Sequence, residues 1–214
     1  MNKLRSIDIP NTVNHIEAGA FHYCYYLHHI HTGDSVTVIG EYAFADCNGL
    51  YIDSIGLIDL KLGKLLKTIE RCAFERCSDL TTVVFPDSVI YIGDRAFGNA
   101  NLLTSVTCKA LTPPVMGVDV FHADALTNAT LYVPLRTIEE YRTADVWKDF
   151  AHIEGIYLPV DANGDSEFNI TDINVMVNRL INGETIEDPA YDLNCDGEVN
   201  VTDVILLINL LVNS

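Results

Sequence analysis

The sequence is short of basic residues and of long apolar runs. It holds 13 Lys and Arg against 30 Asp and Glu over 214 residues, a formal net charge of −17. Phosphate-rich partners are bound by clustered Lys and Arg, so this composition argues against binding to nucleic acid or to an anionic membrane surface and favours cations. The apolar run 204–212 is interrupted by Asn209. It is also shorter than the roughly 20 residues of a membrane span, so no membrane insertion is expected.

Sequence motifs of catalysis are lacking as well. The chain contains no Gly-x-Ser-x-Gly, no His-Glu-x-x-His and no phosphate-binding glycine-rich loop, so we predict that it is not an enzyme. No apolar segment of a signal peptide follows Met1. If the protein is exported, its export signal is therefore expected to be absent from this chain.

Charge divides the chain near Pro159. Residues 1–159 hold 19 acidic and 12 basic residues, a net charge of −7, whereas residues 160–214 hold 11 acidic residues and Arg179 as their single base, a net charge of −10. A quarter of the chain thus carries more than half of its charge. This break predicts two structural parts.

The first part is built of repeats. Ala-Phe pairs end at Phe21, Phe44, Phe74 and Phe97, with spacings of 23, 30 and 23 residues. The seven extra residues of the long repeat lie between Leu50 and Leu57 and are expected to form a loop. In each repeat a short strand, a turn and a return segment form one coil of a solenoid, which is stable only against its neighbours. A fifth strand at 103–108 is expected to close the series.

The repeat Leu80-Thr-Thr-Val-Val-Phe-Pro86, followed by Ile92-Gly-Asp-Arg-Ala-Phe97, resembles the BspA-type leucine-rich repeat. The resemblance implies a leucine-rich repeat solenoid of parallel strands with short return segments over residues 1–112. It also implies a C-terminal cap over residues 113–157, in which we expect a helix around 138–150. Adhesion or protein recognition on the concave face is the function that the family implies.

Residues that flank the inward-pointing strand positions should line that concave face. They are polar and small, which suits contact with a protein surface, although a solvated face with no partner is the alternative. Two parallel columns are expected, Ser6, His29, Asp59, Thr82, Ser105 and Asp8, His31, Lys61, Val84, Thr107. We take Ser6, Asp8, His29, His31, Asp59, Lys61, Thr82 and Thr107 as candidate partner-binding residues.

Two smaller groups of side chains, one of histidines and one of cysteines, are best explained without a functional site. His29, His31 and Asp59 could geometrically form a metal site, but three ligands on a flat sheet are weak support, and solvated histidines are favoured. Cys24 and its repeat equivalents Cys47 and Cys77 occupy one repeat position. They are expected to be a column of buried, reduced thiols.

The acidic second part contains a duplicated loop of twelve residues, 161–172 and 192–203, with oxygen-bearing side chains at positions 1, 3, 5, 9 and 12. Such loops suit Ca²⁺, which takes six to eight oxygen ligands, and position 7 would offer a backbone carbonyl. We expect two Ca²⁺ sites, the first weaker because position 6 is Ser166 instead of the turn-forming Gly197. The candidate ligands are Asp161, Asn163, Asp165, Glu167, Asn169 and Asp172 in the first loop and Asp192, Asn194, Asp196, Glu198, Asn200 and Asp203 in the second.

Each loop leads into an apolar helix, and neither is preceded by the incoming helix of an EF-hand. The duplicated loop-helix unit, residues 160–214, resembles a type I dockerin: a small α-helical, calcium-binding module. Positions 10 and 11 of the loops, which in many dockerins are a hydroxyl pair that contacts cohesin, are here Ile170-Thr171 and Val201-Thr202. Thr171 and Thr202 are therefore candidate partner-binding residues, and calcium binding is the safer expectation.

Together these features predict a non-catalytic protein, secreted or on the surface of a bacterium, that acts in protein recognition or adhesion. The repeats would bind a protein partner, and the calcium-dependent module would dock to a cohesin or pack on the repeats. Two alternatives stay open. The chain could be an accessory component of a glycan-degrading assembly, or a structural spacer in which Ca²⁺ only stabilises the C-terminal module.

Overall fold

A computed structural model describes residues 4–48, 56–165 and 167–213. The expected loop between Leu50 and Leu57 therefore lies outside the described residues except at its end, and so does Ser166. The chain forms two compact units, which we call the repeat unit (Met1–Val133 and Thr137–Glu154) and the helical unit (Pro134–Arg136 and Gly155–Ser214). No helix in the described part of the chain is long and apolar enough to span a membrane.

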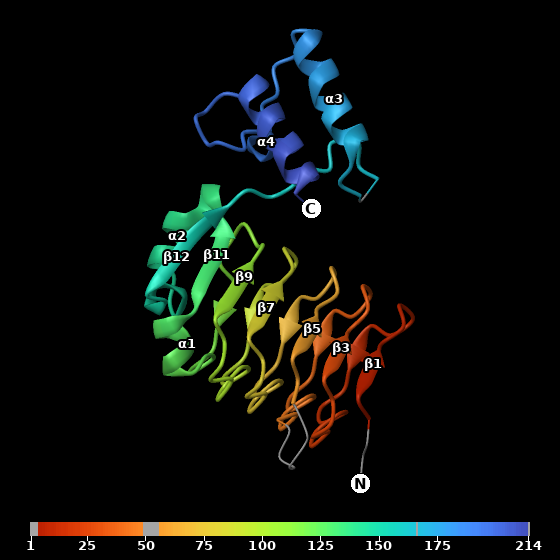
Figure 1. Ribbon diagram of the computed structural model, residues 1–214, viewed down its shortest axis with the longest axis vertical. Helices are drawn as coiled ribbons and strands as arrows, with labels where there is room; N and C mark the ends of the chain where they lie inside the picture. The colour runs from red at the N-terminus through yellow and green to blue at the C-terminus, as the bar shows by residue number, and fades with distance from the viewer. Residues whose placement is uncertain (1–3, 49–55, 166, 214) are drawn as a thin grey trace. The chain divides into compact units, whose positions relative to one another are not determined.

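The repeat unit is a stack of coils whose strands form parallel sheets (Figure 1). One sheet contains β1 (Ser6–Asp8), β3 (His29–His31) and β5 (Asp59–Lys61). A second contains β7 (Thr82–Phe85), β9 (Ser105–Cys108), β11 (Thr130–Pro134) and β12 (His152–Ile156). The return segments form a third sheet of β2 (His15–Ile16), β4 (Val38–Ile39), β6 (Thr68–Ile69), β8 (Tyr91–Ile92) and β10 (Val115–Met116). The predicted solenoid is confirmed.

A column of phenylalanine rings forms the centre of this unit. Phe21, Phe44, Phe74, Phe97 and Phe121 stack in order, with ring centroids 5.0 to 5.8 Å apart and planes within 19° of parallel. The backbone N–H of each of the first four donates to the carbonyl of the residue before the next Phe, at 2.7 to 2.9 Å. The regular Ala-Phe spacing therefore fixes the register of the whole stack.

Thr32 interrupts the apolar pattern of the second repeat and is nevertheless fully buried. Its hydroxyl accepts a hydrogen bond from the Gly63 N–H at 2.9 Å, which satisfies a buried backbone donor. At this point the two coils touch backbone to backbone, because a Cβ added at Gly63 would overlap the carbonyl oxygen of Gly33. Glycine at position 63 is thus required by the spacing of the coils.

The cysteines are free thiols, and all except Cys195 are buried. Cys47 Sγ donates to the Phe21 carbonyl at 3.7 Å, and Cys77 Sγ donates to the Phe44 carbonyl at 3.4 Å. Burial is the main cause that raises the pKa of Cys24 to about 11. These thiols are packing elements, as the repeat position indicates.

The end of the repeat unit differs from the expectation in two ways. The strand at 103–108 does not close the series, because β11 pairs in parallel with β9 and β12 lies beyond it. The helix expected around 138–150 is broken into α2 (Ile138–Thr143) and a 3₁₀ turn, η2 (Trp147–Asp149), with Val146 between them at φ +67°. Helices α1 (Ala123–Asn128) and η1 (Leu135–Thr137) complete this region.

The break in the helix is explained by burial. It lets the Trp147 side chain reach the core, where its indole N–H donates to the Pro114 carbonyl at 2.9 Å. Tyr141 is also buried and donates to the Ala110 carbonyl at 2.8 Å. A straight helix through Val146 would place the two aromatic residues differently, so tertiary packing overrides helix propensity here.

The helical unit consists of α3 (Ile170–Ile181), a 3₁₀ turn η3 (Pro189–Tyr191) and α4 (Val201–Val212), and α3 packs against α4. Its core is small and separate from that of the repeat unit. The buried members are Val160, Ile173, Met176, Ile186, Tyr191, Leu193, Val204 and Leu207.

Candidate functional site

The two twelve-residue loops lead directly into α3 and α4, and their last residue is part of the helix start. In the first loop, Asn169 is the N-cap of α3, and its side-chain oxygen accepts from the Thr171 N–H at 2.9 Å. Asp172 Oδ2 accepts from the Asn169 N–H at 2.8 Å, while Oδ1 accepts from the Ala162 N–H at 2.8 Å. One buried carboxylate therefore joins both ends of the loop to the helix.

The second loop repeats this geometry almost atom for atom. Asp203 Oδ2 accepts from the Asn200 N–H at 2.9 Å, and Oδ1 accepts from the Leu193 N–H at 2.8 Å. Asn200 is the N-cap of α4. Both sequences thus fold into the same carboxylate-closed turn, which is what a shared ligand requirement would produce.

The buried carboxylate of the first loop is held in its charged form. Burial of Asp172 raises its pKa, but the backbone N–H groups of Asn169, Asn163 and Ala162 outweigh this effect, so that the pKa lies below its ordinary value of 3.8. A carboxylate that stays ionised inside a loop of oxygen groups suits a hard cation. This supports the fit of the loop to Ca²⁺.

Further aspartates of the two loops accept hydrogen bonds from the loop backbone. Asp161 Oδ1 accepts from the Gly164 N–H at 2.7 Å, and Asp165 Oδ1 accepts from the Glu167 N–H at 2.8 Å. In the second loop, Asp196 Oδ1 accepts from the Glu198 N–H at 2.9 Å. Over the described residues, His, Cys, Asp and Glu side chains form no group of three placed to hold a metal. A Ca²⁺ ion bound here would therefore also need Asn side-chain oxygens and backbone carbonyls, which are ligands that Ca²⁺ accepts.

Helix α4 has an exposed apolar stripe. Its members, spaced four, three and four residues apart, are Val201, Ile205, Ile208 and Val212. Ile205 is 52% exposed and Val212 is 77% exposed, while Val204 and Leu207 on the inner face are buried. The core of the helical unit is therefore already closed without this stripe. The sequence of the helix is apolar nearly all round, but it did not show which of these residues stay exposed.

The predicted contact threonines lie beside the helix starts. Thr171 and Thr202 are both exposed. The Thr171 hydroxyl donates to Asn169 Oδ1 at 2.8 Å and accepts from the Asn163 side-chain amide at 2.7 Å, so it is held within its loop.

A shallow pocket of about 500 Å³ lies elsewhere on the helical unit. Phe168 from the first loop and Leu206 and Leu210 from α4 supply most of its apolar lining, together with Tyr157 and Pro159. This pocket was not predicted from the sequence, because it is formed by residues that are far apart in the chain.

In the repeat unit, the exposed strand face carries the two predicted columns in register. Ser6 pairs with His29 and His29 with Asp59, while Asp8 pairs with His31 and His31 with Lys61. Further along, Thr82 pairs with Ser105 and Val84 with Thr107 in a separate sheet.

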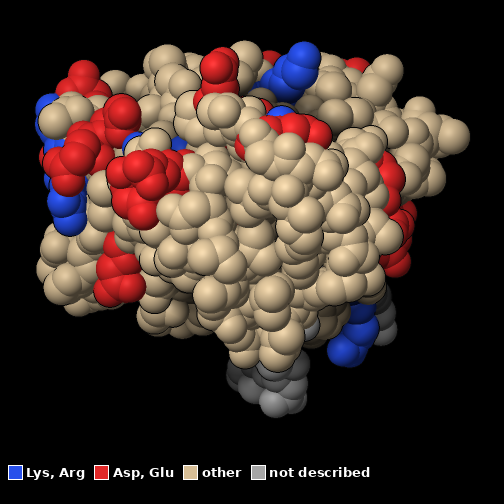
Figure 2. Space-filling view, turned by 90° about the horizontal axis from the view of Figure 1, so that it is seen from above, with Lys and Arg blue, Asp and Glu red and all other residues tan. Residues whose placement is uncertain are grey.

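Histidine and aspartate side chains meet on this face without forming a metal cluster. His29 Nδ1 lies 3.4 Å from Asp59 Oδ2, and His31 Nδ1 lies 3.7 Å from Asp8 Oδ1. Each imidazole faces one carboxylate of a neighbouring strand, in two separate pairs. Figure 2 views the molecule from above, and not onto this strand face, and there Asp and Glu side chains predominate over Lys and Arg.

Family models match both parts of the chain. The BspA-type leucine-rich repeat region matches residues 1–56 and 51–153 in six copies, and the dockerin type I domain matches residues 159–212. The chain belongs to the BspA-type leucine-rich repeat family. It also carries a dockerin type I domain, and the helical unit is therefore called the dockerin module below.

Two solved structures with TM-scores above 0.5 support the fold of the repeats. A leucine-rich repeat protein of T. pallidum is 21% identical with a TM-score of 0.55, over 72% of this chain and 71% of that one. The pneumococcal vaccine antigen PcpA is 22% identical with a TM-score of 0.51, over 72% of this chain and 42% of that one. A leucine-rich cell surface protein of Faecalibacterium prausnitzii is 23% identical with a TM-score of 0.45, over 70% and 31%. A search of curated protein sequences gives no match.

These two families support a role in protein interaction or at the cell surface, and both are typically extracellular or surface-associated. They are generally non-catalytic. Type I dockerins bind calcium, and the module is expected to have a protein partner such as a cohesin.

Proposed function

We propose that this chain is a non-catalytic, secreted or surface-exposed recognition protein of a bacterium, in which the strand face of the repeats binds a protein partner and the dockerin module docks to a cohesin. The module folds on two Ca²⁺ ions held by the twelve loop residues named above. Ca²⁺ would neutralise carboxylates that otherwise repel one another and would fix the starting points of α3 and α4.

The apolar stripe of α4 is the observation that carries the docking proposal. Its side chains stay in water although the dockerin module already has a closed core, and four exposed branched side chains in a row on one helix are typical of an interaction surface. The equivalent positions of α3, 31 residues earlier, are Ile170, Asn174, Val177 and Ile181. Asn174 interrupts that stripe, so α4 is the better docking surface.

The docking test uses the full chain and a panel of purified type I cohesin domains, with Ca²⁺ and with chelator. Ile205→Glu places a charge in the stripe and is expected to weaken binding about a hundredfold, since central apolar contacts dominate interface energies. Two matched controls, Ile181→Glu on α3 and Leu102→Glu in the repeats, carry the same charge change on exposed residues. If no cohesin binds, or if all three variants bind alike, the stripe is not the docking surface and the spacer alternative gains support.

Calcium stoichiometry is measured separately by titration of the metal-free full chain. Asp165→Asn and Asp196→Asn remove one charge from the first and the second loop, and each is expected to abolish one of two binding events. Glu187→Gln is the control, because Glu187 is exposed and lies outside both loops. A wild-type chain that binds one ion or none would contradict the proposal of two sites.

The strand face is tested with the same full chain against surface proteins of neighbouring cells. His31→Ala combined with Lys61→Ala removes two adjacent side chains from one column while leaving their buried neighbours in place. A partner that the double variant no longer captures, but that the α4 variant Ile205→Glu still captures, would be assigned to the strand face. Equal capture by the double variant would remove the proposed role of this column.

A further inference from the structure

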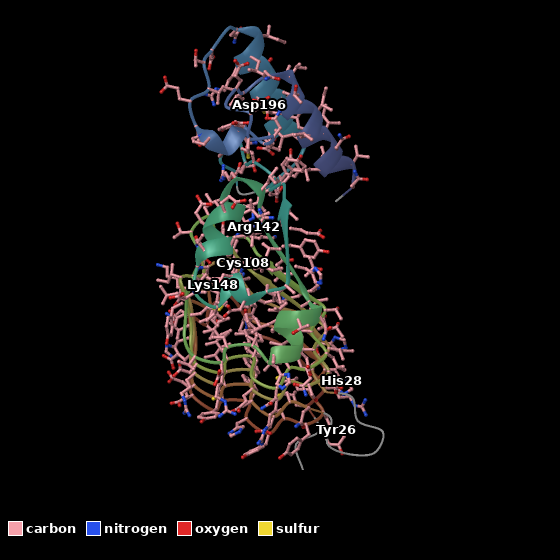
Figure 3. All side chains as sticks on the ribbon, turned by 90° about the vertical axis from the view of Figure 1, so that its left-hand side faces the viewer. Tyr26, His28, Cys108, Arg142, Lys148 and Asp196 are labelled. Atoms are coloured by element: carbon pink, nitrogen blue, oxygen red, sulfur yellow. The ribbon has the colours of Figure 1, made fainter. Side chains whose placement is uncertain are left out.

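A row of flat side chains crosses the turns of the first three coils. It begins at His22, shortly before Tyr26 and His28 in the chain, both of which Figure 3 labels. The ring of His22 stacks on that of Tyr23, with centroids 3.8 Å apart and planes at 14°. The His22 ring also stacks on that of Tyr42, with centroids 5.7 Å apart and planes at 22°. The Arg71 guanidinium continues the row 5.4 Å from the Tyr42 ring centre. We call this row the aromatic row.

The aromatic row does not belong to the core. The stacked phenylalanines are the ring layer that holds the coils together, whereas Tyr23 is 53% exposed and His22 and Tyr42 are half-buried. Removal of these rings would open no cavity in the interior. The stability of the repeat unit therefore does not explain why these aromatic rings are present at the surface.

The turns themselves do not require aromatic residues. Tyr23 and Tyr42 have φ of +61° and +55°, in a region that bulky residues rarely adopt. At the equivalent turn positions, other coils carry small or polar residues with the same conformation, such as Asn99 at +62° and Asp119 at +53°. The first coils thus place tyrosine where the backbone disfavours it, which indicates a use for the rings.

Hydrogen-bonding groups surround the row and fix it. Arg71 donates to Glu41 Oε1 and to the Tyr42 hydroxyl, both at 2.8 Å. Asp46 lies 3.3 Å from His22 Nε2 and 3.4 Å from Arg76 Nη1. The side chains of Arg71 and Arg76 stay half or more exposed, so they have N–H groups at the surface. A rigid surface of this kind loses little conformational entropy when it binds a ligand.

We propose that the aromatic row binds a neutral glycan. The flat C–H face of a pyranose ring packs on an aromatic face, whose π electrons carry partial negative charge. His22 covers one face of the Tyr23 ring, so the sugar would pack on the other face of this exposed ring, beside Tyr25, whose ring lies 5.8 Å away and is tilted by 41°.

The hydroxyl groups at the rim of the sugar would bond to the flanking carboxylate and guanidinium groups. Arg71 and Arg76 are paired with Glu41 and Asp46, and the Glu70 carboxylate accepts from the Glu41 N–H, so the border of the row has no excess of positive charge. An anionic ligand such as a nucleic acid or an acidic glycan would therefore find no basic surface here.

The test uses the calcium-loaded full chain and a panel of soluble neutral polysaccharides (β-glucan, xylan and mannan), with polygalacturonate as the anionic comparison, measured by affinity electrophoresis and calorimetry. Tyr23→Asn installs the residue that the fourth coil carries at this turn, so the backbone is preserved. We expect it to weaken binding of a neutral polysaccharide about tenfold. Tyr91→Thr is the matched control, because Tyr91 is an exposed tyrosine on β8, next to Thr68 on β6.

The expected pattern is binding by the wild-type chain and by Tyr91→Thr and weaker binding by Tyr23→Asn, at unchanged melting temperature. The proposal is overturned if no neutral polysaccharide binds at millimolar sugar concentration, or if Tyr23→Asn binds as well as the wild type. It is also overturned if the polygalacturonate binds more tightly, or if Tyr23→Asn loses only a protein partner. Cohesin docking by α4 is measured in the same samples and should not change, so the two proposals fail separately.

Discussion

The two units of this chain reach stability in different ways. The repeat unit holds a continuous column of stacked rings and a backbone ladder that links each coil to the next. The dockerin module has a core of eight buried apolar residues, and its two loops are closed by the carboxylates of Asp172 and Asp203. Packing dominates in the first unit and charge in the second. The following experiments test that contrast, from the largest expected effect to the smallest.

Truncation of a central ring should affect the repeat unit alone. Phe74→Ala removes a fully buried ring that stacks on both neighbours, and we expect the free energy of unfolding to fall by about 3–5 kcal/mol. Phe21→Ala, at the less buried end of the column, should cost less. Denaturant titrations followed by near-UV and far-UV circular dichroism separate the two units. A helical signal that melts earlier in Phe74→Ala would contradict independent stability.

Withdrawal of calcium should affect the dockerin module alone. With free Ca²⁺ about a hundredfold above the dissociation constant, chelation removes about 3 kcal/mol from the folded module. Calorimetry should show one transition moving to lower temperature while the repeat transition stays in place. If both transitions shift together, the units are coupled; if neither shifts, the loops do not bind calcium when folded.

The two units should also respond to opposite ends of the pH range. Burial is the main cause that raises the pKa of the Cys108 thiol from 9.0 to about 11. Since the unfolded chain loses this proton first, Cys108 alone should lower the free energy of unfolding of the repeat unit by about 2 kcal/mol between pH 9 and 11, and Cys24, whose pKa is also raised to about 11, adds to this loss. The pKa of Asp172 is lowered, so the module should lose stability as the pH drops below about 3.8. Melting curves over pH 2–11 test both; a Cys108→Ala variant that keeps the full alkaline loss would refute this assignment.

Loss of one buried hydroxyl should have a moderate effect. Tyr141→Phe keeps the ring but leaves the Ala110 carbonyl without its hydrogen bond, which should cost about 1–2 kcal/mol. Tyr91→Phe, at an exposed position, is the control and should be neutral. The comparison is made by urea titration, and equal stability of both variants would show that the buried hydrogen bond contributes nothing.

Backbone conformation at a turn should have the smallest effect. Asn99 has φ +62°, so Asn99→Ala is expected to destabilise the repeat unit by about 1 kcal/mol, while Asn99→Gly should change it by less than about 0.5 kcal/mol. The same urea titration measures both. A more stable alanine variant would show that this turn carries no such conformational restriction.

Much of the architecture could be predicted from the sequence because it depends on spacing. The Ala-Phe pairs predict the register of the coils, and the duplicated loops predict two equivalent helix starts, whereas the stacking of the Phe rings into a column is seen only in the structure. The fifth ring was missed because Phe121 follows Val120 instead of alanine. The broken helix was missed because a left-handed Val146 is imposed by burial of Trp147, and burial is a tertiary effect.

The candidate sites were predictable to different degrees. The loop ligands follow from a fixed spacing, and the strand columns follow from the alternation of side chains along a strand. The aromatic row could not be read from the sequence, because His22, Tyr42 and Arg71 come from three coils and meet only through the lateral stacking of their turns.

The backbone ladder between the coils has a consequence for how such a chain changes in length. The backbone N–H of each of the first four Phe residues in the column finds its acceptor in the following coil, so each of these coils offers its successor the same edge that it uses toward its predecessor. A gene segment that encodes one whole coil can therefore be duplicated or lost without a mismatch at the junction. A fragment of a coil is tolerated only where the ladder bonds on both sides of it are kept, as in the 30-residue spacing between Phe44 and Phe74, whose rings still stack.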